Sequence, residues 1–308
     1  MPDLILHHYP NSPFSEKIRV IFGYKKLAWK SVLIPTIMPK PNLVALTGGY
    51  RKTPVLQIGA DIYCDTALIA DVLERIAPTP TLYPQESAGL ARTLAQWADS
   101  TLFWTVIPYI FQPAAMASVL GDATPEQMKA FAADRAAFRG NAPRMSTAEA
   151  TGQLLEYLRR LDDMLAHGQP YLLGSQASIA DFSVYHCLWF VQKAKEVASI
   201  LDHAPRLAPW LARMADFGHH QFDKLRAEDA IVIARDSEPA MSTASVVDTH
   251  AIALGEQVAI MPSDYGIDPV EGELVIASDN TFAVRRTDPQ AGTVVVHFPR
   301  LGFHMKRI

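Results

Sequence analysis

The sequence predicts a multidomain α+β protein in three successive parts, and three changes of pattern along its 308 residues support this. Residues 1–84 alternate strand and helix patterns, residues 87–226 are almost purely helical in pattern, and residues 229–308 consist of short β-rich runs. Because a domain holds roughly 150 residues, a chain of this length is expected to form two or three domains. We therefore expect a small α/β domain, an all-α bundle and a small all-β, barrel-like domain.

The first part reads as strand, helix, strand, then hairpin and helix. "DLILHHY" is a buried strand, "SPFSEKIRVIFGYKKL" an amphipathic helix and "WKSVLIP" a second strand. "TPVLQIGADIYCD" is a hairpin with its turn at residues 59–61, and "TALIADVLERIA" is a helix that stops before a proline. This βαβ-ββα order predicts a small mixed sheet with helices packed on it.

The second part carries helix patterns with recognisable starts. "AGLARTLAQWADSTLFWTVIPYIF" predicts one long amphipathic helix. In a later segment Thr124 is expected as the N-cap, with Pro125 at the first helical position and Gln127 closing a capping box. We expect a helical bundle here.

The third part changes to strands divided by turns. "AIVIARDS", "HAIALGEQVAIMP", "GELVIASDN", "TFAVRRTD" and "TVVVHFPR" are short β-rich runs separated by Asp, Asn, Gly and Pro. Their spacing predicts a separate small antiparallel barrel or sandwich. "DSEPAMSTAS", residues 236–245, is the predicted linker or long loop.

Composition narrows the class of protein. The net charge is −4 and the isoelectric point is near 6.2, which argues against nucleic acid and acidic membrane surfaces as partners. Cys64 and Cys187 are the two cysteines, so neither a disulfide framework nor a cysteine-rich zinc site can form. No secretory or membrane-spanning pattern is visible, and a cytoplasmic location is expected.

Ser12 lies where the first strand passes into the first helix, in "HHYPNSPFSEKIRV". As an N-cap its oxygen would accept a free backbone N–H, and Pro13 would take the favoured first position. The same helix N-terminus also favours anions, and a bound thiolate there could accept a hydrogen bond from a hydroxyl. These residues alone leave both interpretations open.

Further motifs follow in order along the chain. Thr53-Pro54 begins the third strand, where a proline can carry a cis bond, and Asp65-Thr66 stands where the fourth strand enters a helix. "SIADF", residues 178–182, is a capping box. Together with "SPFS" these motifs resemble the cytosolic glutathione transferase family over roughly residues 3–220. The resemblance implies a thioredoxin-like N-terminal domain and an all-helical domain after it.

The resemblance also implies roles for single residues. Lys52 stands where related classes often place a lysine that contacts glutathione. The main chain of Thr53, before Pro54, would pair with the cysteinyl backbone of glutathione. Asp65 would accept the γ-glutamyl amine of the ligand, and the hydroxyl and N–H of Thr66 would hold its carboxylate.

Two residues are candidates for activating the thiol of glutathione. "SPFS" is similar to the active-site turn of the classes that use serine, so Ser12 would contact the sulfur. Tyr9 lies close to where other classes place a catalytic tyrosine, and its alternative is a packed strand-end aromatic. We rank Ser12 ahead of Tyr9. Neither cysteine falls at this turn, which argues against a thiol-disulfide oxidoreductase.

The first long helix lines the pocket for the apolar co-substrate in the family. Its aromatic residues Phe103, Trp104, Tyr109 and Phe111 are expected mainly in the core, with some of them lining that pocket.

The function implied is a glutathione transferase that lowers the thiol pKa of glutathione and conjugates it to a small apolar electrophile. Glutathione would be a co-substrate, with no metal or redox cofactor, and a homodimer is expected. An alternative is a non-catalytic glutathione-binding or scaffold protein that recruits a partner through residues 229–308. A glutathione-dependent isomerase or dehalogenase would use the same site. The family does not normally carry residues 229–308, for which a protein contact or interface role is favoured.

Overall fold

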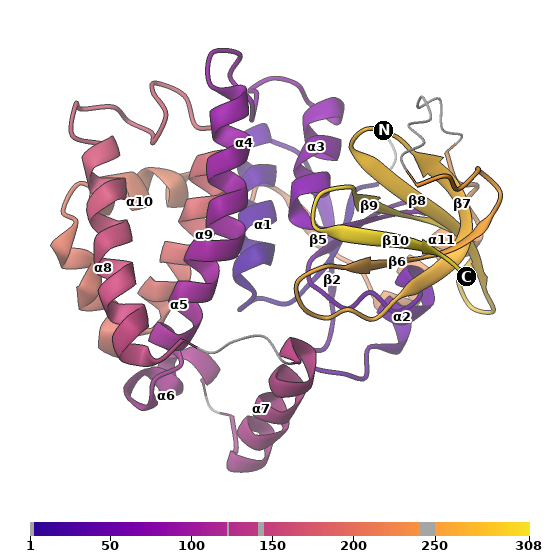
Figure 1. The fold of residues 1–308 in the computed structure, drawn as a ribbon, viewed down its shortest axis with the longest axis horizontal. Helices are drawn as coiled ribbons and strands as arrows, with labels where there is room; N and C mark the ends of the chain where they lie inside the picture. The colour runs from indigo at the N-terminus through magenta and orange to yellow at the C-terminus, as the bar shows by residue number, and fades with distance from the viewer. Residues whose placement is uncertain (1–2, 122, 141–144, 241–249) are drawn as a thin grey trace.

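The fold has a helical half and a sheet half, as the computed structural model of residues 3–121, 123–140, 145–240 and 250–308 shows (Figure 1). The predicted βαβ-ββα order of the first part is confirmed. An additional helix between the second and third strands was not predicted. The elements are β1 (Ile5–His8), α1 (Pro13–Lys25), β2 (Trp29–Leu33), α2 (Pro41–Thr47), β3 (Val55–Ile58), β4 (Asp61–Cys64) and α3 (Thr66–Ile76).

The helical part follows as predicted, with one difference in its first helix. The expected long helix is divided by a π-helical turn, and the capping boxes at Thr124 and Ser178 are both present. The elements are α4 (Ala88–Trp97), η1 (Ala98–Leu102), α5 (Phe103–Ile110), η2 (Pro113–Ala115), α6 (Met116–Leu120), α7 (Pro125–Arg139), α8 (Thr147–Met164), α9 (Ile179–Lys193), η3 (Lys195–His203) and α10 (Leu207–Asp216).

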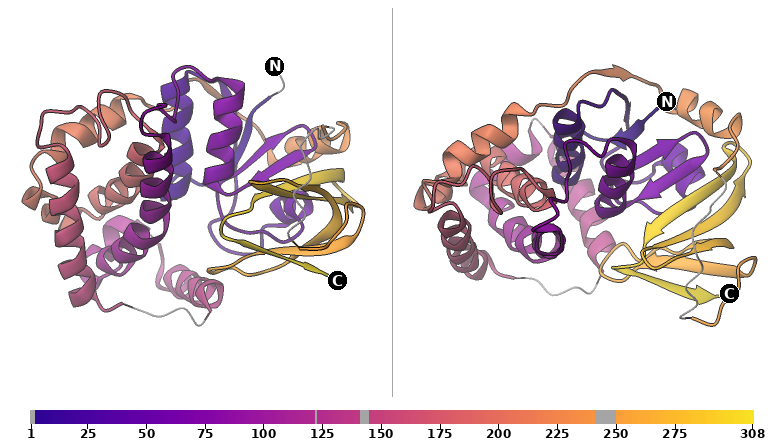
Figure 2. Two further views of the ribbon diagram at one scale, coloured as in Figure 1. Left: turned by 45° about the horizontal axis from the view of Figure 1, so that its top comes forward. Right: turned by 90° about the horizontal axis from the view of Figure 1, so that it is seen from above.

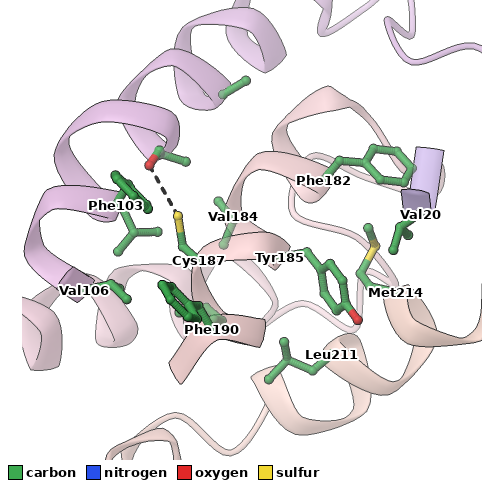
Figure 3. Close-up of a cluster of buried hydrophobic side chains, with 14 of the residues drawn as sticks. Val20, Phe103, Val106, Phe182, Val184, Tyr185, Cys187, Phe190, Leu211 and Met214 are labelled. Carbon is green, nitrogen blue, oxygen red and sulfur yellow. Dashed lines mark hydrogen bonds between the residues drawn. The ribbon is translucent and has the colours of Figure 1, made fainter. Parts of the chain in front are cut away.

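Helix α9 forms the centre of the helical core (Figure 3). Its residues from Ile179 to Leu188 are all buried, so it is covered on every side. Cys187 lies inside this packing with its thiol directed at the carbonyl oxygen of Ala98, at 3.5 Å. Burial raises the pKa of Cys187, as it does that of Cys64, so both thiols stay protonated and unreactive.

The C-terminal part contains five strands, β6 (Gln257–Pro262), β7 (Val270–Ala277), β8 (Thr281–Asp288), β9 (Gly292–Pro299) and β10 (Phe303–Arg307). They are antiparallel to one another, as expected. Two sequence predictions before them were wrong. "AIVIARDS" is helix α11 (Ala227–Arg235), and β5 (Phe222–Lys224) is a strand in the region predicted to be helical. An apolar run of this length fits a buried strand or one helix face equally well.

The C-terminal strands are not a separate unit, because they continue the N-terminal sheet. The strand order is β10-β6-β7-β8-β9-β4-β3-β1-β2-β5, one ten-stranded sheet. β9 pairs in parallel with β4 from Asp61↔Val295 to Tyr63↔His297, and Nε2 of His297 lies 2.7 Å from Oδ1 of Asp61. The predicted separate barrel is thus corrected to a sheet extension. Of the predicted linker, residues 236–240 are described, and the rest lies outside the described residues.

Each face of the sheet has its own core. One core joins α1 and α3 to the helical bundle, and the other lies between α2, α11 and the C-terminal strands. β1 shows the division, because His8 contacts Ser31 at 2.8 Å and Arg19 of α1, whereas His7 contacts Gln57 at 2.8 Å. Burial lowers the pKa of His7 to about 4 and, with Arg19, that of His8 to about 3. Both rings are therefore neutral near pH 7.

One further test concerns membrane spans. Within the described residues no single helix has the length and apolar character to cross a bilayer, although a pair bent by 82°, Ala88–Ile110 with Pro113–Leu120, passes on those criteria together.

Candidate functional site

Ser12 is the N-cap of α1 and is 2% exposed. Its Oγ accepts the backbone N–H of Ser15 at 3.2 Å, and Pro13 begins the helix. The predicted capping role is confirmed. The cap uses a lone pair of the hydroxyl and leaves its hydrogen available to donate, so capping and hydrogen bonding to a ligand are compatible.

Tyr9 belongs to the same turn, since its carbonyl oxygen accepts the N–H of Ser12 at 3.2 Å. Burial raises the pKa of the Tyr9 phenol, while Arg135 and the Ser12 hydroxyl oppose the rise. The phenol is therefore protonated at neutral pH and can act as a hydrogen-bond donor. The structure places both candidate thiol-activating residues side by side.

Thr53-Pro54 lies next to this turn, with a cis peptide bond. β3 begins at Val55, which pairs with His7, so the main chain of Thr53 lies just beyond the ladder between β1 and β3. The Thr53 hydroxyl is 3.4 Å from Nζ of Lys40.

Asp65 and Thr66 stand at the N-terminus of α3. Asp65 has a φ of 75° and caps the helix through the N–H of Ala67 at 2.8 Å. Burial raises the pKa of its carboxyl, against the attraction of Lys17 and Lys52. Thr66 is 5% exposed, and its hydroxyl accepts from Nζ of Lys17 at 3.1 Å.

Lys52 is near the site but is held by the C-terminal part of the chain. Its Nζ lies 2.6 Å from Oδ1 of Asp264 and 3.9 Å from the centre of the Tyr265 ring. The predicted ligand-contacting lysine is thus already paired in this structure, with residues that sequence reasoning did not connect to the site.

Lys17 was missed by the sequence interpretation. Its side chain is fully buried, and its ammonium forms an ion pair with Asp99 of the π-helical turn at 2.6 Å. Asp99 in turn lies 2.9 Å from Nε2 of His186 on α9. Burial alone would raise the pKa of Asp99, but Lys17 and His186 lower it to about 2. This network links Thr66 to the helical part. A lysine one turn from Phe14 and Ile21, on the apolar face of α1, was the signal that could have revealed it.

Lys40 was also missed, and no sequence pattern marks it. It is 3% exposed, and burial together with Arg135 and Arg51 lowers its pKa to about 8. Its Nζ lies 5.6 Å from the centre of the Tyr9 ring. A partly charged, buried ammonium beside Thr53 suits an anionic ligand group.

Three lysines come together around the candidate site. Lysines 17, 40 and 52 surround the two helix N-termini, which favours a ligand with carboxylates. Two surface hollows, one bordered by Trp29 and Phe222 and the other by Pro80 and Tyr171, lie elsewhere. Among the described residues no group of three or more His, Cys, Asp or Glu side chains could hold a metal ion.

Comparison with known proteins adds to this geometry. Residues 6–81 match the model for the glutathione S-transferase N-terminal domain, and residues 144–213 match that for its C-terminal domain. A GST-like protein from Pseudomonas syringae is 41% identical with a TM-score of 0.85, and all of both chains is covered. No match was found among curated proteins.

More distant structures share the fold of the first two parts. A glutathione S-transferase from Rhodospirillum rubrum F11 is 20% identical with a TM-score of 0.54, covering 69% of this chain and 87% of its own. The beta-etherase LigF from Sphingobium sp. strain SYK-6 is 19% identical with a TM-score of 0.50, covering 69% and 94%. The Pseudomonas syringae match includes residues 229–308, so the added strands are shared with that protein.

Proposed function

Because this chain belongs to the glutathione transferase family, we propose that it binds glutathione at the turn around Ser12 and activates the thiol for attack on a small apolar electrophile. The observation that carries the proposal is the meeting of Ser12, cis-Pro54 and Asp65-Thr66 at two helix N-termini. Chain segments up to 54 residues apart in sequence converge there, and Lys17 and Lys40 contact them.

The proposed binding mode divides the ligand between these groups. Asp65 accepts the γ-glutamyl ammonium, and the hydroxyl and backbone N–H of Thr66 hold the adjoining carboxylate. The main chain of Thr53 pairs with the cysteinyl backbone. Lys40, beside the Thr53 hydroxyl, is placed for the glycyl carboxylate. Lys52 is a further contact once it leaves Asp264.

The proposed chemistry is stabilisation of a thiolate. The thiol of free glutathione has a pKa of about 8.5, so about 3% is ionised at pH 7. A hydrogen bond from Ser12 and the N-terminus of α1 both favour the charged form. A decrease of about two pKa units would raise the ionised fraction to about 75%. The sulfur then bonds to an electrophilic carbon of the co-substrate, which either releases a leaving group as an anion or, at an activated double bond, takes up a proton on the neighbouring carbon.

Tyr9 is the second candidate donor. Because its pKa is raised, the phenol keeps its proton and can donate to the same sulfur. Ser12 remains ranked first on the similarity of its turn to that of serine-using classes.

The test compares Ser12→Ala, Tyr9→Phe and Asp65→Asn with the wild type. Calorimetry gives glutathione affinity, and thiolate absorbance across pH gives the pKa of the bound thiol. Ser12→Ala should bind glutathione with its thiol pKa back near the free value, Tyr9→Phe should change that pKa less, and Asp65→Asn should lose affinity. Absence of wild-type binding at millimolar glutathione would defeat the proposal.

A binding role without turnover is the second candidate function. The ion pair between Asp264 and Lys52 favours it, because the C-terminal part already occupies a ligand contact. Wild-type binding of glutathione with no conjugation, isomerisation or dehalogenation of a panel of electrophiles would support this candidate. A cytoplasmic homodimer is part of the same proposal, as is a protein contact made by residues 229–308.

A further inference from the structure

The loop between β6 and β7 extends from the C-terminal strands toward the helical part (Figure 2), and its residues contact Lys52 of the candidate site. The N–H of Gly266 donates to the carbonyl oxygen of Phe138 on α7 at 2.9 Å. Asp264 holds Lys52 at 2.6 Å. The loop is therefore attached both to the helical part and to the glutathione side of the site.

Gly266 is required for this close approach. Its φ is +58°, and a Cβ atom there would lie 2.2 Å from Cε2 of Phe138. A side chain at this position would strain the backbone and force either the loop or the Phe138 ring to move. The loop is thus seated in one defined position between the two parts.

Tyr265, between Asp264 and Gly266, packs between α5, α7 and Lys52. Its ring packs edge-on against Trp104 of α5 at 4.9 Å and against Phe138 at 5.0 Å. On the other side it covers Nζ of Lys52 at 3.9 Å. Burial raises the pKa of its phenol, and the carboxylates of Asp264 and Asp65 add to the rise, so the hydroxyl is protonated.

We propose that Tyr265 sets the size of the group that can be attached to the glutathione sulfur, so that the native acceptor is a small electrophile. The ring lies between Lys52, on the proposed glutathione side, and Trp104 of α5. A substituent on the sulfur that extends toward Trp104 must take the space that the ring fills. An aromatic ring fixed on three sides by packing leaves little room for a second apolar group.

This inference rests on the proposed function, since it needs glutathione bound at the Ser12 turn. The probes are glutathione and S-hexylglutathione, whose six-carbon chain lies on the sulfur and does not react. Affinities for both are measured by calorimetry on full-length wild type, Tyr265→Ala, Tyr265→Leu and Tyr265→Phe. Tyr157→Ala is the matched control, because Tyr157 of α8 packs edge-on against Trp97 of α4, outside the site.

Tyr265→Ala should tighten S-hexylglutathione at least about tenfold, which corresponds to burying about two more methylene groups, because the chain fills the cavity that the ring leaves. Its affinity for glutathione should change less than about threefold, because the substitution removes only one cation–π contact to Lys52 on that side. The affinity of Tyr265→Leu for S-hexylglutathione should lie between those of the wild type and Tyr265→Ala. Tyr265→Phe and Tyr157→Ala should bind S-hexylglutathione as the wild type does. Thermal unfolding confirms that each variant is folded.

The outcomes separate the two proposals. If the wild type binds glutathione and folded Tyr265→Ala and Tyr265→Leu bind S-hexylglutathione no better than the wild type does, the size-limiting role is overturned while the proposed function stands. If the wild type binds neither probe, the proposed function is wrong, and this inference is overturned with it.

Discussion

The buried ion pair between Lys17 and Asp99 offers a direct test of what joins the two family domains. The perturbation is Asp99→Asn, which keeps the shape of the side chain and removes its charge. Lys17 is fully buried, and Asp99 is its carboxylate partner at 2.6 Å. Removing one partner of a buried pair costs about 3–5 kcal/mol, because the other charge is left in a low dielectric. We expect Asp99→Asn to lose about that much free energy of unfolding.

The double variant Lys17→Met/Asp99→Leu separates charge from packing. Apolar replacement of both partners is often nearly neutral, but the Thr66 hydroxyl and His186 each lose a partner, at about 1–3 kcal/mol for each group left unsatisfied. Because the double variant leaves no unpaired buried charge, the cycle with Lys17→Met and Asp99→Leu should show a coupling of about 2 kcal/mol or more.

The assay is equilibrium unfolding in urea followed by circular dichroism, with glutathione affinity as a second readout. Affinity should fall in both variants, because Asp99→Asn no longer holds Lys17 beside Thr66 by charge and the double variant lacks Lys17 altogether. Two results would refute the reasoning. One is a loss of unfolding free energy below about 1 kcal/mol in Asp99→Asn, and the other is a loss in the double variant equal to the sum of the losses in Lys17→Met and Asp99→Leu.

Three other predictions concern pH and chain length. His7 has a pKa of about 4 in the folded protein and about 6.5 in the unfolded chain. The free energy of unfolding should therefore fall by about 3 kcal/mol for this residue as the pH drops from 6.5 to 4. The urea midpoint of His7→Gln should fall less steeply over the same range. Because Lys40 loses its proton near pH 8, the affinity for S-methylglutathione, whose thiol is blocked, should weaken as the pH rises through that value. If the affinity of Lys40→Met depends on pH as steeply as that of the wild type, Lys40 does not have this role. A chain ending at residue 226 exposes the β4 edge and one apolar face of the sheet, so it should aggregate and bind hydrophobic dyes. A monodisperse fragment that unfolds cooperatively would instead support the predicted domain boundary at residue 229.

Most of the first two parts was predictable because their signals are local. The N-cap at Ser12, the proline at position 54 and the capping box at Ser178 each follow from a few adjacent residues. The roles of the site residues stay predictions, although the structure brings Ser12, Thr53, Asp65 and Thr66 together around Lys17 and Lys40.

What escaped prediction depends on distant pairs. Nothing near Lys40 shows that Arg51 and Arg135 will lie close enough to shift its pKa. The pairing of β4 with β9 joins residues more than 230 positions apart, and period-two patterns do not reveal which strand edge a segment will meet. Tyr265 was unrecognised for the same reason, since its loop reaches the site only through that sheet.

The β4–β9 pairing also sets the timing of folding during synthesis. In most multidomain proteins the N-terminal domain folds while the ribosome is still translating the rest. Here one face of the first sheet is buried only when Val294, Val296 and Phe298 have been synthesised, and these lie within the last fifteen residues. At about 5–20 residues per second, the roughly 230 residues after β4 take about 10–50 seconds to emerge. During that interval β4 is an open edge in the nascent chain, so this protein should depend more on chaperones than a transferase whose sheet is complete at its first domain.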